Sequence, residues 1–312
     1  MRKRIGERTL LFRSEPRVRS AAAIVAKNEG DGAFSGRYDT VLEDDKFGEA
    51  SFEKAECRMF RTAAMLACQK AGLDLSGIHA MLAGDLLNQL ITANYAARDL
   101  GIPFLGLYGA CSTMAESLLL GGVLSDGGYC SPVLCCASSH FSTAERQYRF
   151  PLEMGTTAPP TAQRTVTGAG ALLLSTQDVP LPVFSHVALT AATIGRVVDL
   201  GITDMNNMGA AMAPACCDTI LAHLNDTGSD LADYDLVVSG DRRNPAVDRH
   251  VAREVEPDRA ATRANEGIRR RAACAWAAAR LIRLAHTAVG FGWIGDIVAV
   301  AAAIDAAGLS AS

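Results

Sequence analysis

The clearest hydrophobic pattern along the chain is helical and covers residues 49–71, "EASFEKAECRMFRTAAMLACQKA". Apolar side chains recur there at the spacing of helical turns, at Phe52, Met59, Ala63 and Ala67. Residues spaced in this way lie on one face of a helix. We therefore predict an amphipathic helix that packs this face against a core.

The segments that follow alternate between short apolar runs and helical patterns. Apolar runs at 78–85, 104–110 and 132–138 are bounded by turn-forming residues, which is typical of buried strands. Residues 90–101 between them have a helical pattern, and another helix begins just after Cys111 and extends to about residue 124. This alternation predicts an α/β fold with a mostly parallel sheet.

A weak internal repeat suggests two similar halves. The segment 71–85, "AGLDLSGIHAMLAGD", aligns with 227–241, "TGSDLADYDLVVSGD". The identical pairs are Gly72 with Gly228, Asp74 with Asp230, Leu75 with Leu231, Gly84 with Gly240 and Asp85 with Asp241. Each copy follows a helical pattern and ends an apolar run, although a generic helix–turn–strand unit would share part of this. The repeat favours a duplicated α/β unit.

Composition narrows the class of protein. The chain has 312 residues, of which 49% are apolar, so it can bury a sizeable core as one large domain or two joined halves. A formal net charge of -4 argues against binding to nucleic acid. The cysteines include the adjacent pairs at 135–136 and 216–217 but no C-x-x-C motif, so we predict reduced, buried thiols and neither a metal site nor a cofactor. The basic N-terminus has no apolar stretch of signal-peptide length, so we predict no signal peptide.

The composition changes abruptly at about Arg242. The segment 242–312 is rich in Ala and Arg, contains no Lys, and has no strand pattern until 294–304. An alternative-frame translation of GC-rich DNA would look like this tail, and sequencing the genomic locus would test that hypothesis. Residues 284–304 are long enough to span a bilayer, but Asp296 makes insertion costly, so we predict no transmembrane helix.

The stretch "LYGACSTMAES", residues 107–117, contains the most suggestive chemistry. Cys111 lies where a strand turns into a helix, and Thr113 with Glu116 fits a capping box. The free N–H groups and the dipole of a helix start would lower the pKa of the thiol and could hold an oxyanion. The alternative is a small buried Cys in a tight turn. His140, which follows the next strand, is the candidate base.

Polar side chains follow two of the predicted strands. Asp85, Asn88 and Gln89 come after the strand at 78–85, at the sheet edge where α/β proteins bind ligands. Asp85 could instead cap the following helix.

The segment 138–151, "SSHFSTAERQYRFP", brings together Ser139, His140, Glu145, Arg146 and Arg149. On a helix, the two arginines three residues apart would share a face and could grip two carboxylates. The alternative is a solvated face with a Glu145–Arg149 pair.

Long strings in this sequence resemble the stage V sporulation protein AD family of spore-forming bacteria. They include "TANYAARDLGIPFLGLYGACSTMAE", "SSHFSTAERQYRFP", "TVTGAGALLL", "VVDLGITDMNNMGAAMAPACCDTI" and "YDLVVSGD". The resemblance covers roughly residues 8–241 and ends at the composition change.

The resemblance implies a thiolase-like α/β fold with two similar βαβαβ halves and mixed, mostly parallel sheets. It assigns 1–180 to the N-terminal half carrying Cys111 and 181–241 to the start of the second half, leaving 242–312 as an unmatched tail. It implies a homodimer that binds dipicolinic acid (pyridine-2,6-dicarboxylate) and assists its uptake with membrane proteins of the same operon, peripheral at the inner membrane of the forespore or spore.

In this interpretation Cys111 is a vestigial nucleophile position without catalytic function. The expected ligand-binding residues are Cys111, Ser112, Asp85, Asn88, Ser139, His140, Arg146 and Arg149. Two alternatives stay open: a thiolase or ketoacyl-synthase type of acyltransferase that uses Cys111 as its nucleophile, and a folded remnant without function. His250 and His286 lie in the unmatched tail, so acyl transfer lacks a second-half base with family context.

Overall fold

The computed structural model describes most of the chain before residue 235. The described residues are 2–31, 36–148, 165–176, 187–203, 208–230, 233–234 and 299–304.

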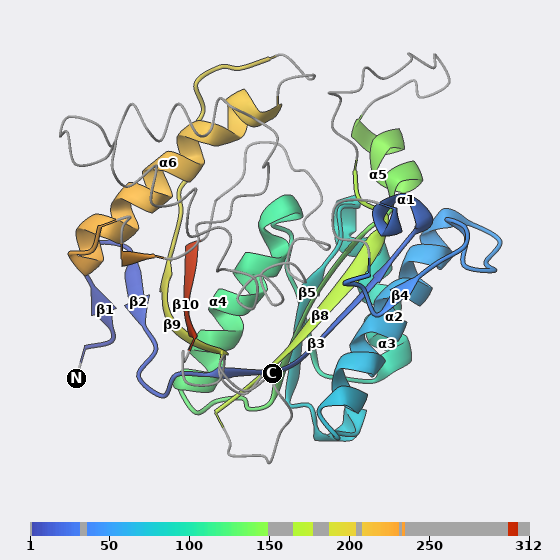
Figure 1. The fold of residues 1–312 in the computed structure, drawn as a ribbon, viewed down its shortest axis with the longest axis horizontal. Coiled ribbons are helices and arrows are strands. Elements are labelled where there is room, and N and C mark those ends of the chain that lie inside the picture. Colours follow the sequence, from blue (N-terminus) through green and yellow to red (C-terminus); the bar gives the residue numbers. More distant parts are fainter. Residues whose placement is uncertain are drawn as a thin grey trace.

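The described strands form one mixed sheet (Figure 1). They are β1 (Arg4–Ile5), β2 (Thr9–Leu11), β3 (Arg17–Val25), β4 (Thr40–Val41), β5 (Ala80–Gly84), β6 (Phe104–Gly106), β7 (Val133–Ser139), β8 (Gly168–Ser175), β9 (Val187–Thr193) and β10 (Ala299–Ile304). Their order is β1-β2-β9-β3-β8-β7-β5-β6, with β4 beside β3 and β10 beside β9. Strand β5 is parallel to β6 and β7, and β3 is parallel to β4. The other described pairs are antiparallel, among them β8 with β7 and β3, so the described sheet is mixed as expected but not mostly parallel.

Helices cover both faces of this sheet. They are α1 (Lys27–Gly30), α2 (Phe52–Lys70), α3 (Ile91–Leu100), α4 (Thr113–Asp126), α5 (Phe141–Tyr148) and α6 (Met208–Thr227). Helices α2 and α3 pack side by side in one core cluster, and α4 belongs to a second cluster on the opposite face. Helix α6 lies over β1, β2 and β9, at the far end of the sheet from α2 (Figure 1).

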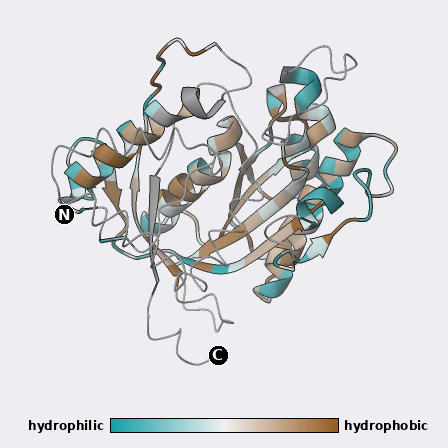
Figure 2. Ribbon diagram, turned by 45° about the horizontal axis from the view of Figure 1, so that its top comes forward, coloured by the Kyte–Doolittle hydropathy of each residue, from teal (hydrophilic) through white to brown (hydrophobic). Residues whose placement is uncertain are grey.

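The alternation of side chains along each strand explains the two cores. On β5, Met81 and Ala83 point into the core under α2 and α3, while Leu82 points into the core under α4. A strand with helices on both faces must be apolar on both, which is why β5, β7 and β8 are buried along their length. Figure 2 shows the resulting gradient, with hydrophobic strands inside and hydrophilic positions on the outer surfaces of the helices.

The helices and strands predicted before residue 140 are confirmed, with one difference in length. Helix α3 ends as expected at Gly101, whose φ of 67° is the left-handed conformation that favours glycine. Strand β6 is shorter than the predicted run at 104–110 and ends at Gly106. Leu107 still donates to Ala83 O at 2.9 Å, but the following residues turn away toward Cys111.

Where both copies of the internal repeat are described, at the turn after the helix, they have the same backbone structure. Gly72 after α2 and Gly228 after α6 both have left-handed φ angles, 65° and 68°. In each copy the next residue bonds back to the helix, with Leu73 N to Cys68 O at 3.0 Å and Ser229 N to Leu224 O at 3.1 Å. The matched aspartates each accept a backbone N–H, as Gly77 N to Asp74 O at 2.9 Å and Asp233 N to Asp230 O at 3.0 Å. These matched turns support the predicted duplication.

Little of the second half and tail is described. Residues 235–298 and 305–312 lie outside the described residues, so the division at 180 and 241 stays a prediction. The late strand pattern corresponds to β10, which pairs antiparallel with β9. None of the described helices is long and apolar enough to cross a membrane.

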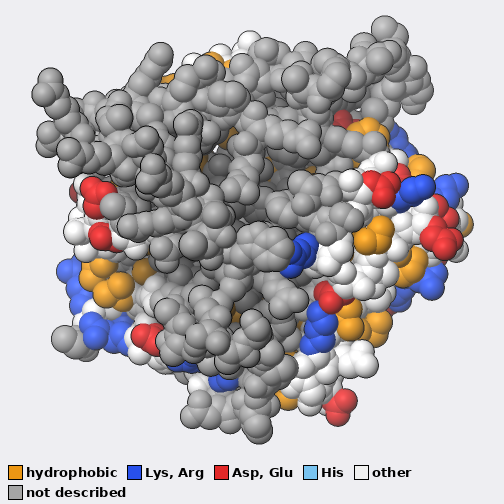
Figure 3. Space-filling model, in the orientation of Figure 1, with side chains coloured by type: hydrophobic (Ala, Val, Ile, Leu, Met, Phe, Trp, Pro, Cys, Tyr) orange, Lys and Arg blue, Asp and Glu red, His pale blue; other side chains and the backbone are white. Residues whose placement is uncertain are grey.

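The thiols and surface charges agree with the composition. All cysteines in the described part of the chain are free, and both adjacent pairs, Cys135–Cys136 and Cys216–Cys217, are buried. Burial raises the pKa of the Cys135 thiol to about 12, so it is a neutral, space-filling group. Among the coloured, described side chains in Figure 3, acidic and basic groups are interspersed, and neither sign gathers into a large patch.

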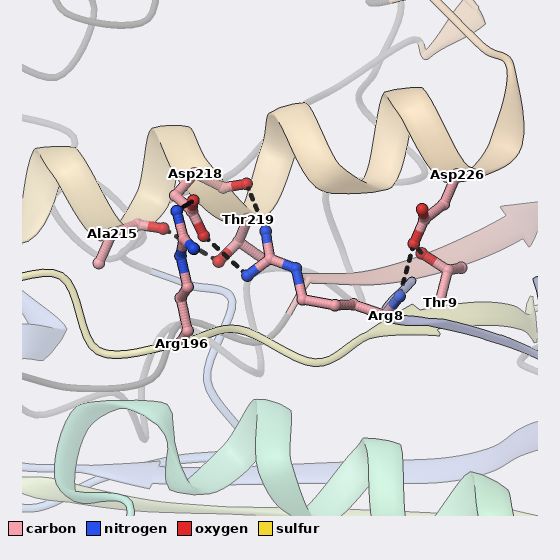
Figure 4. Close-up of polar contacts among 7 residues, drawn as sticks. All are labelled: Arg8, Thr9, Arg196, Ala215, Asp218, Thr219 and Asp226. Atoms are coloured by element: carbon pink, nitrogen blue, oxygen red, sulfur yellow. Dashed lines mark hydrogen bonds and ion pairs between the residues drawn. The ribbon is translucent and has the colours of Figure 1, made fainter. Parts of the chain in front are cut away.

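The N-terminal hairpin β1–β2 is fastened to α6 by charged side chains (Figure 4). Asp226 accepts from the backbone N–H groups of Glu7 and Arg8, both at 2.9 Å, and from the Thr9 hydroxyl at 2.9 Å. About two turns earlier on α6, Asp218 forms ion pairs with Arg8 and with Arg196, each at 2.7 Å. The hairpin therefore joins the first residues of the chain to the described start of the second half.

Candidate ligand-binding site

The Cys111 turn connects β6 to α4 through a short 3-10 helix, Ala110–Ser112. Ala110 has a φ of 48°, an uncommon left-handed conformation for a residue with a side chain. A Cβ at Gly109 would lie 2.4 Å from Glu116 Oε2 and 2.7 Å from Ser112 Oγ, so a larger residue there would displace these two side chains. The space beside Gly109 is thus filled by the protein's own Glu116 and Ser112. Cys111 itself is half-buried.

The predicted capping box at Thr113 and Glu116 is wrong. Ser112, and not Thr113, occupies the position before α4, and the Ser112 side chain makes no capping hydrogen bond. The preceding 3-10 helix explains this, because Ser112 N donates to Gly109 O and Thr113 N donates to Ala110 O. Backbone carbonyls therefore satisfy N–H groups that a cap would have bonded. The Thr113 hydroxyl is buried with no hydrogen-bond partner among the described residues.

The predicted lowering of the Cys111 pKa is also wrong. Burial raises the pKa of this thiol well above its usual value, and a backbone N–H opposes the shift only in part. Desolvation penalises the thiolate, and the helix start offers less compensation because its first N–H groups are already bonded. Cys111 is therefore a neutral thiol at physiological pH.

Asp85 lies at the end of β5 and caps the start of α3. Its side chain is buried, Oδ1 accepts from Leu87 N at 2.8 Å, and Oδ2 accepts from Ala93 N at 2.7 Å. Burial raises the pKa of Asp85 to about 6, against the effect of these N–H groups. The structure thus shows the capping arrangement that was one of the two interpretations of this residue. The side chain of Asn88 lies outside the described residues.

The Asp85 turn and the Cys111 turn meet at Gly84. A Cβ on Gly84 would lie 2.0 Å from the backbone oxygen of Leu107 and 3.0 Å from Thr113 Cγ2. The structure therefore brings together two of the segments that the sequence predicted to share a site.

The third segment, after β7, has its polar groups largely engaged within the protein. Ser139 donates to Val166 O at 2.6 Å. His140 is fully buried, its Nδ1 accepts from Ser142 N at 3.1 Å, and its Nε2 lies 2.8 Å from Asp45 O. This pattern requires a neutral ring with the proton on Nε2. Burial lowers the pKa of His140, which is consistent with that neutral form.

Arg146 on α5 is the exposed cation of this segment. Its Nε donates to Ser142 O at 3.3 Å, and NH1 lies 3.9 Å from Glu53 Oε1, with half of the side chain exposed. Glu145 is instead buried and accepts from Thr165 Oγ1 at 2.8 Å. Arg149 lies outside the described residues, so its role as a ligand residue stays a prediction.

One buried residue at this edge of the sheet was missed by the sequence analysis. Glu56 on α2 is fully buried and accepts from Ser138 Oγ at 2.8 Å and from Thr143 Oγ1 at 3.3 Å. The signal was present, because Glu56 falls between Phe52 and Met59 on the apolar face of the predicted helix. A carboxylate on such a face is rarely buried without a specific partner. Among the described residues, no group of three or more His, Cys, Asp or Glu side chains could hold a metal ion.

Comparison with known proteins places this arrangement in a family. Residues 6–260 match the model of the family described as Stage V sporulation protein AD. The chain is also 43% identical over 236 residues to Stage V sporulation protein AD of Bacillus subtilis (strain 168), across 76% of this chain and 68% of that protein. This chain belongs to the stage V sporulation protein AD family. Membership supports a role in sporulation, and the family match extends beyond the composition change at Arg242.

Solved structures confirm the fold expected from the sequence. A crystal structure of a variant of Xanthomonas campestris OleA has a TM-score of 0.55 at 12% identity, covering 80% of this chain and 82% of that chain. A second variant of the same protein has a TM-score of 0.54 at 15% identity, covering 80% of this chain and 84% of that chain. The mixed α/β, thiolase-like class is therefore confirmed. Identities this low show the fold alone.

Proposed function

We propose that this protein binds dipicolinic acid as a non-enzymatic step in sporulation, and that the ligand docks where the Gly84, Cys111 and β7–α5 segments converge. The observation that carries the proposal is the neutral, half-buried thiol of Cys111 in a member of a sporulation family. A protonated thiol is a poor nucleophile but can still contact an aromatic ring. A protein that keeps the Cys111 turn but holds its thiol neutral would bind a ligand there without transferring an acyl group.

The charge and shape of dipicolinate suit the groups at this edge. The ligand is a planar dianion, so it needs cationic or N–H partners for two carboxylates. Among the described residues, the exposed Arg146 is held by a 3.3 Å hydrogen bond and a 3.9 Å ion pair, so its guanidinium can turn to a ligand carboxylate at little cost. Both carboxylate oxygens of the ionised Asp85 already accept hydrogen bonds from backbone N–H groups. Asp85 therefore orients the turn between β5 and α3 and does not contact the dipicolinate anion.

Delivery of dipicolinate into the spore requires partners, and the proposed partners are membrane proteins of the same operon. In this proposal the protein is peripheral at the inner membrane of the forespore or spore. It would receive or present the ligand while the membrane partners provide the path through the bilayer.

The proposed homodimer has a candidate contact at β6. This strand is the outer one of the described sheet and hydrogen-bonds to β5 on one side. Leu105 on β6 and Tyr108 just after it are 53% and 56% exposed, and Ile91 and Tyr95 on the adjacent α3 are exposed too. An unpaired edge flanked by apolar side chains can pair with a second copy of itself.

Calorimetric titration of the full chain with dipicolinate tests the proposal. Loss of one charge-assisted contact costs about 1.5–3 kcal/mol, so Arg146→Ala should weaken binding by roughly 10- to 100-fold. Arg13→Ala, which removes an exposed Arg near the N-terminus, is the matched control and should bind like the wild type. Absence of binding by folded wild-type protein would contradict the proposal.

Acetyl-CoA provides the competing test. If the protein binds without catalysis, incubation with acetyl-CoA leaves Cys111 unmodified in a peptide mass spectrum. A Cys111 thioester that turns over would instead establish acyl transfer as the function.

A further inference from the structure

Glu56 ties helix α2 to the junction between β7 and α5. Ser138 Oγ, near the end of β7, donates to one carboxyl oxygen, and Thr143 Oγ1, on the first turn of α5, lies 3.3 Å from the other. The Thr143 hydroxyl has a single proton, and His140 O lies 3.1 Å from it. When Thr143 donates to His140 O, its oxygen can accept a hydrogen bond from a neutral Glu56 carboxyl, so the same group fixes the backbone inside the junction. Ser139, His140 and Arg146 of the proposed ligand site are all attached to this junction.

The charge environment of Glu56 favours its neutral form. Asp85, at the end of β5, is the charged group that acts on Glu56 among the described residues, and it repels a second negative charge. The other ionisable side chains on the elements packed around Glu56 include Glu53, Lys54, Cys57, Arg58, Arg61, Cys68 and Lys70 on α2, Cys135 and Cys136 on β7, His140 at the junction, and Glu145 and Arg146 on α5. On α2, Arg58 is directed to Glu49, Arg61 to Asp99 and Lys70 to Asp39. Burial keeps the thiols and the imidazole neutral, and Arg146 is directed to Ser142 O and Glu53. No cation among these groups compensates an ionised Glu56.

We propose that Glu56 is a positioning residue of the ligand site: its neutral carboxyl holds the β7–α5 junction closed, and loss of its proton releases the junction. Glu56 touches no ligand in this scheme and acts through Ser138 and Thr143. The effect on ligand affinity rests on the proposed dipicolinate function, whereas the effect on the junction does not.

The direction of the pH dependence follows from linkage. Burial, and then the charge of Asp85, raise the pKa of Glu56 from 4.5 to about 8, although the Ser138 and Thr143 hydroxyls oppose the shift. When the junction opens and Glu56 meets water, the group loses its proton above its ordinary pKa. The contribution of the Glu56 proton to the stability of the closed junction is therefore complete below pH 4.5. This contribution is lost as the pH rises from there toward 8, and no further loss occurs beyond 8.

Hydrogen–deuterium exchange of the full chain measures this opening directly. After correction for the intrinsic exchange rate, the opening equilibrium of residues 138–148 should rise by up to about tenfold per pH unit between pH 5 and 8. Glu56→Gln keeps the shape and an acceptor for Ser138 but cannot ionise, so its opening should not change with pH. Glu53→Gln, one turn earlier on α2 and partly exposed, should keep the wild-type slope. An equal slope in Glu56→Gln and wild type would overturn the proposal.

Two further measurements keep the test independent of variant folding and of the proposed function. Carbon-13 NMR of the Glu side chains in wild-type protein should show one carboxyl that titrates near pH 8, and its absence would also overturn the proposal. Dipicolinate affinity should fall as the pH rises from 5 to 8 in the wild type but not in Glu56→Gln. If exchange behaves as expected while dipicolinate never binds, the junction inference stands and the proposed function fails.

Discussion

At the scale of single residues, Gly84 is where the candidate site depends most on the absence of a side chain. Gly84→Ala would place Cβ 2.0 Å from Leu107 O, so backbone must move. We expect a loss of about 2–3 kcal/mol in the free energy of unfolding, measured by urea denaturation. Gly77→Ala is the matched control, because nothing lies within 4 Å of the added Cβ, and it should change stability by less than about 0.5 kcal/mol. Equal effects of the two variants would contradict this account of Gly84.

Sequence reasoning at this scale found the right positions but not their chemistry. The position of Cys111 at a helix start follows from local pattern, and the structure confirms it. The pKa of the Cys111 thiol depends on its burial by residues that are distant in the sequence, and the local sequence pattern does not reveal that burial. The same holds for His140, whose Nε2 partner Asp45 is 95 residues away, and for Glu56, which is 82 residues from Ser138. These contacts exist only after distant strands have paired.

At the scale of helices and strands, the elements that could be predicted from the sequence are those whose regular hydrophobic pattern extends over many residues. Helix α2 and strands β5 and β7 match the predicted segments closely, because burial on one or both faces imposes a regular pattern. Strands β1 to β4, β8 and β9 were not predicted. β1 and β2 are two and three residues long, too short to show a period, and they exist because β9 and α6 provide partners. β3, β8 and β9 are long, but they are buried on both faces and rich in Ala, so they lack the alternation of polar and apolar residues that marks a strand.

The attachment of the hairpin β1–β2 to α6 should depend on pH. Burial raises the pKa of Asp226, but the N–H groups of Arg8 and Glu7 and the Thr9 hydroxyl outweigh it, so the net pKa is lowered. The stabilisation is therefore present above the ordinary pKa of an aspartate and is lost as the pH falls through the lowered value. Because water screens part of the charge, Asp226→Asn should cost only about 1 kcal/mol at pH 7, and it should flatten the acid limb of the unfolding curve.

Asp74→Asn is the control for that measurement, since the Asp74 side chain caps no helix. It should keep the wild-type acid limb in urea titrations between pH 2 and 7. If the free energy of unfolding of Asp226→Asn equals that of the wild type at both pH 2 and pH 7, the attachment of the hairpin to α6 contributes nothing to stability.

At the scale of the whole molecule, the exposed edge at β6 determines whether the proposed dimer forms. Leu105→Lys places a charge on this edge, and charged edge strands resist pairing. We expect it to shift the protein from dimer to monomer in sedimentation equilibrium while the circular dichroism spectrum stays unchanged. Tyr129→Lys, at an exposed aromatic residue before β7, should leave the dimer intact. A monomeric wild-type protein would contradict the dimer itself.

The hairpin β1–β2 also has a consequence for the order of events during synthesis. Its backbone reaches partners as far as 219 residues away, from Glu7 to Asp226. At 5–20 residues per second, a ribosome needs roughly 10–45 s to supply that partner. The hairpin residues are therefore among the last to reach their final contacts, although they are synthesised well before α6. A nascent chain halted before residue 208, where α6 begins, should leave its N-terminus open to protease, although the sheet around β3, β7 and β8 already has every strand it needs.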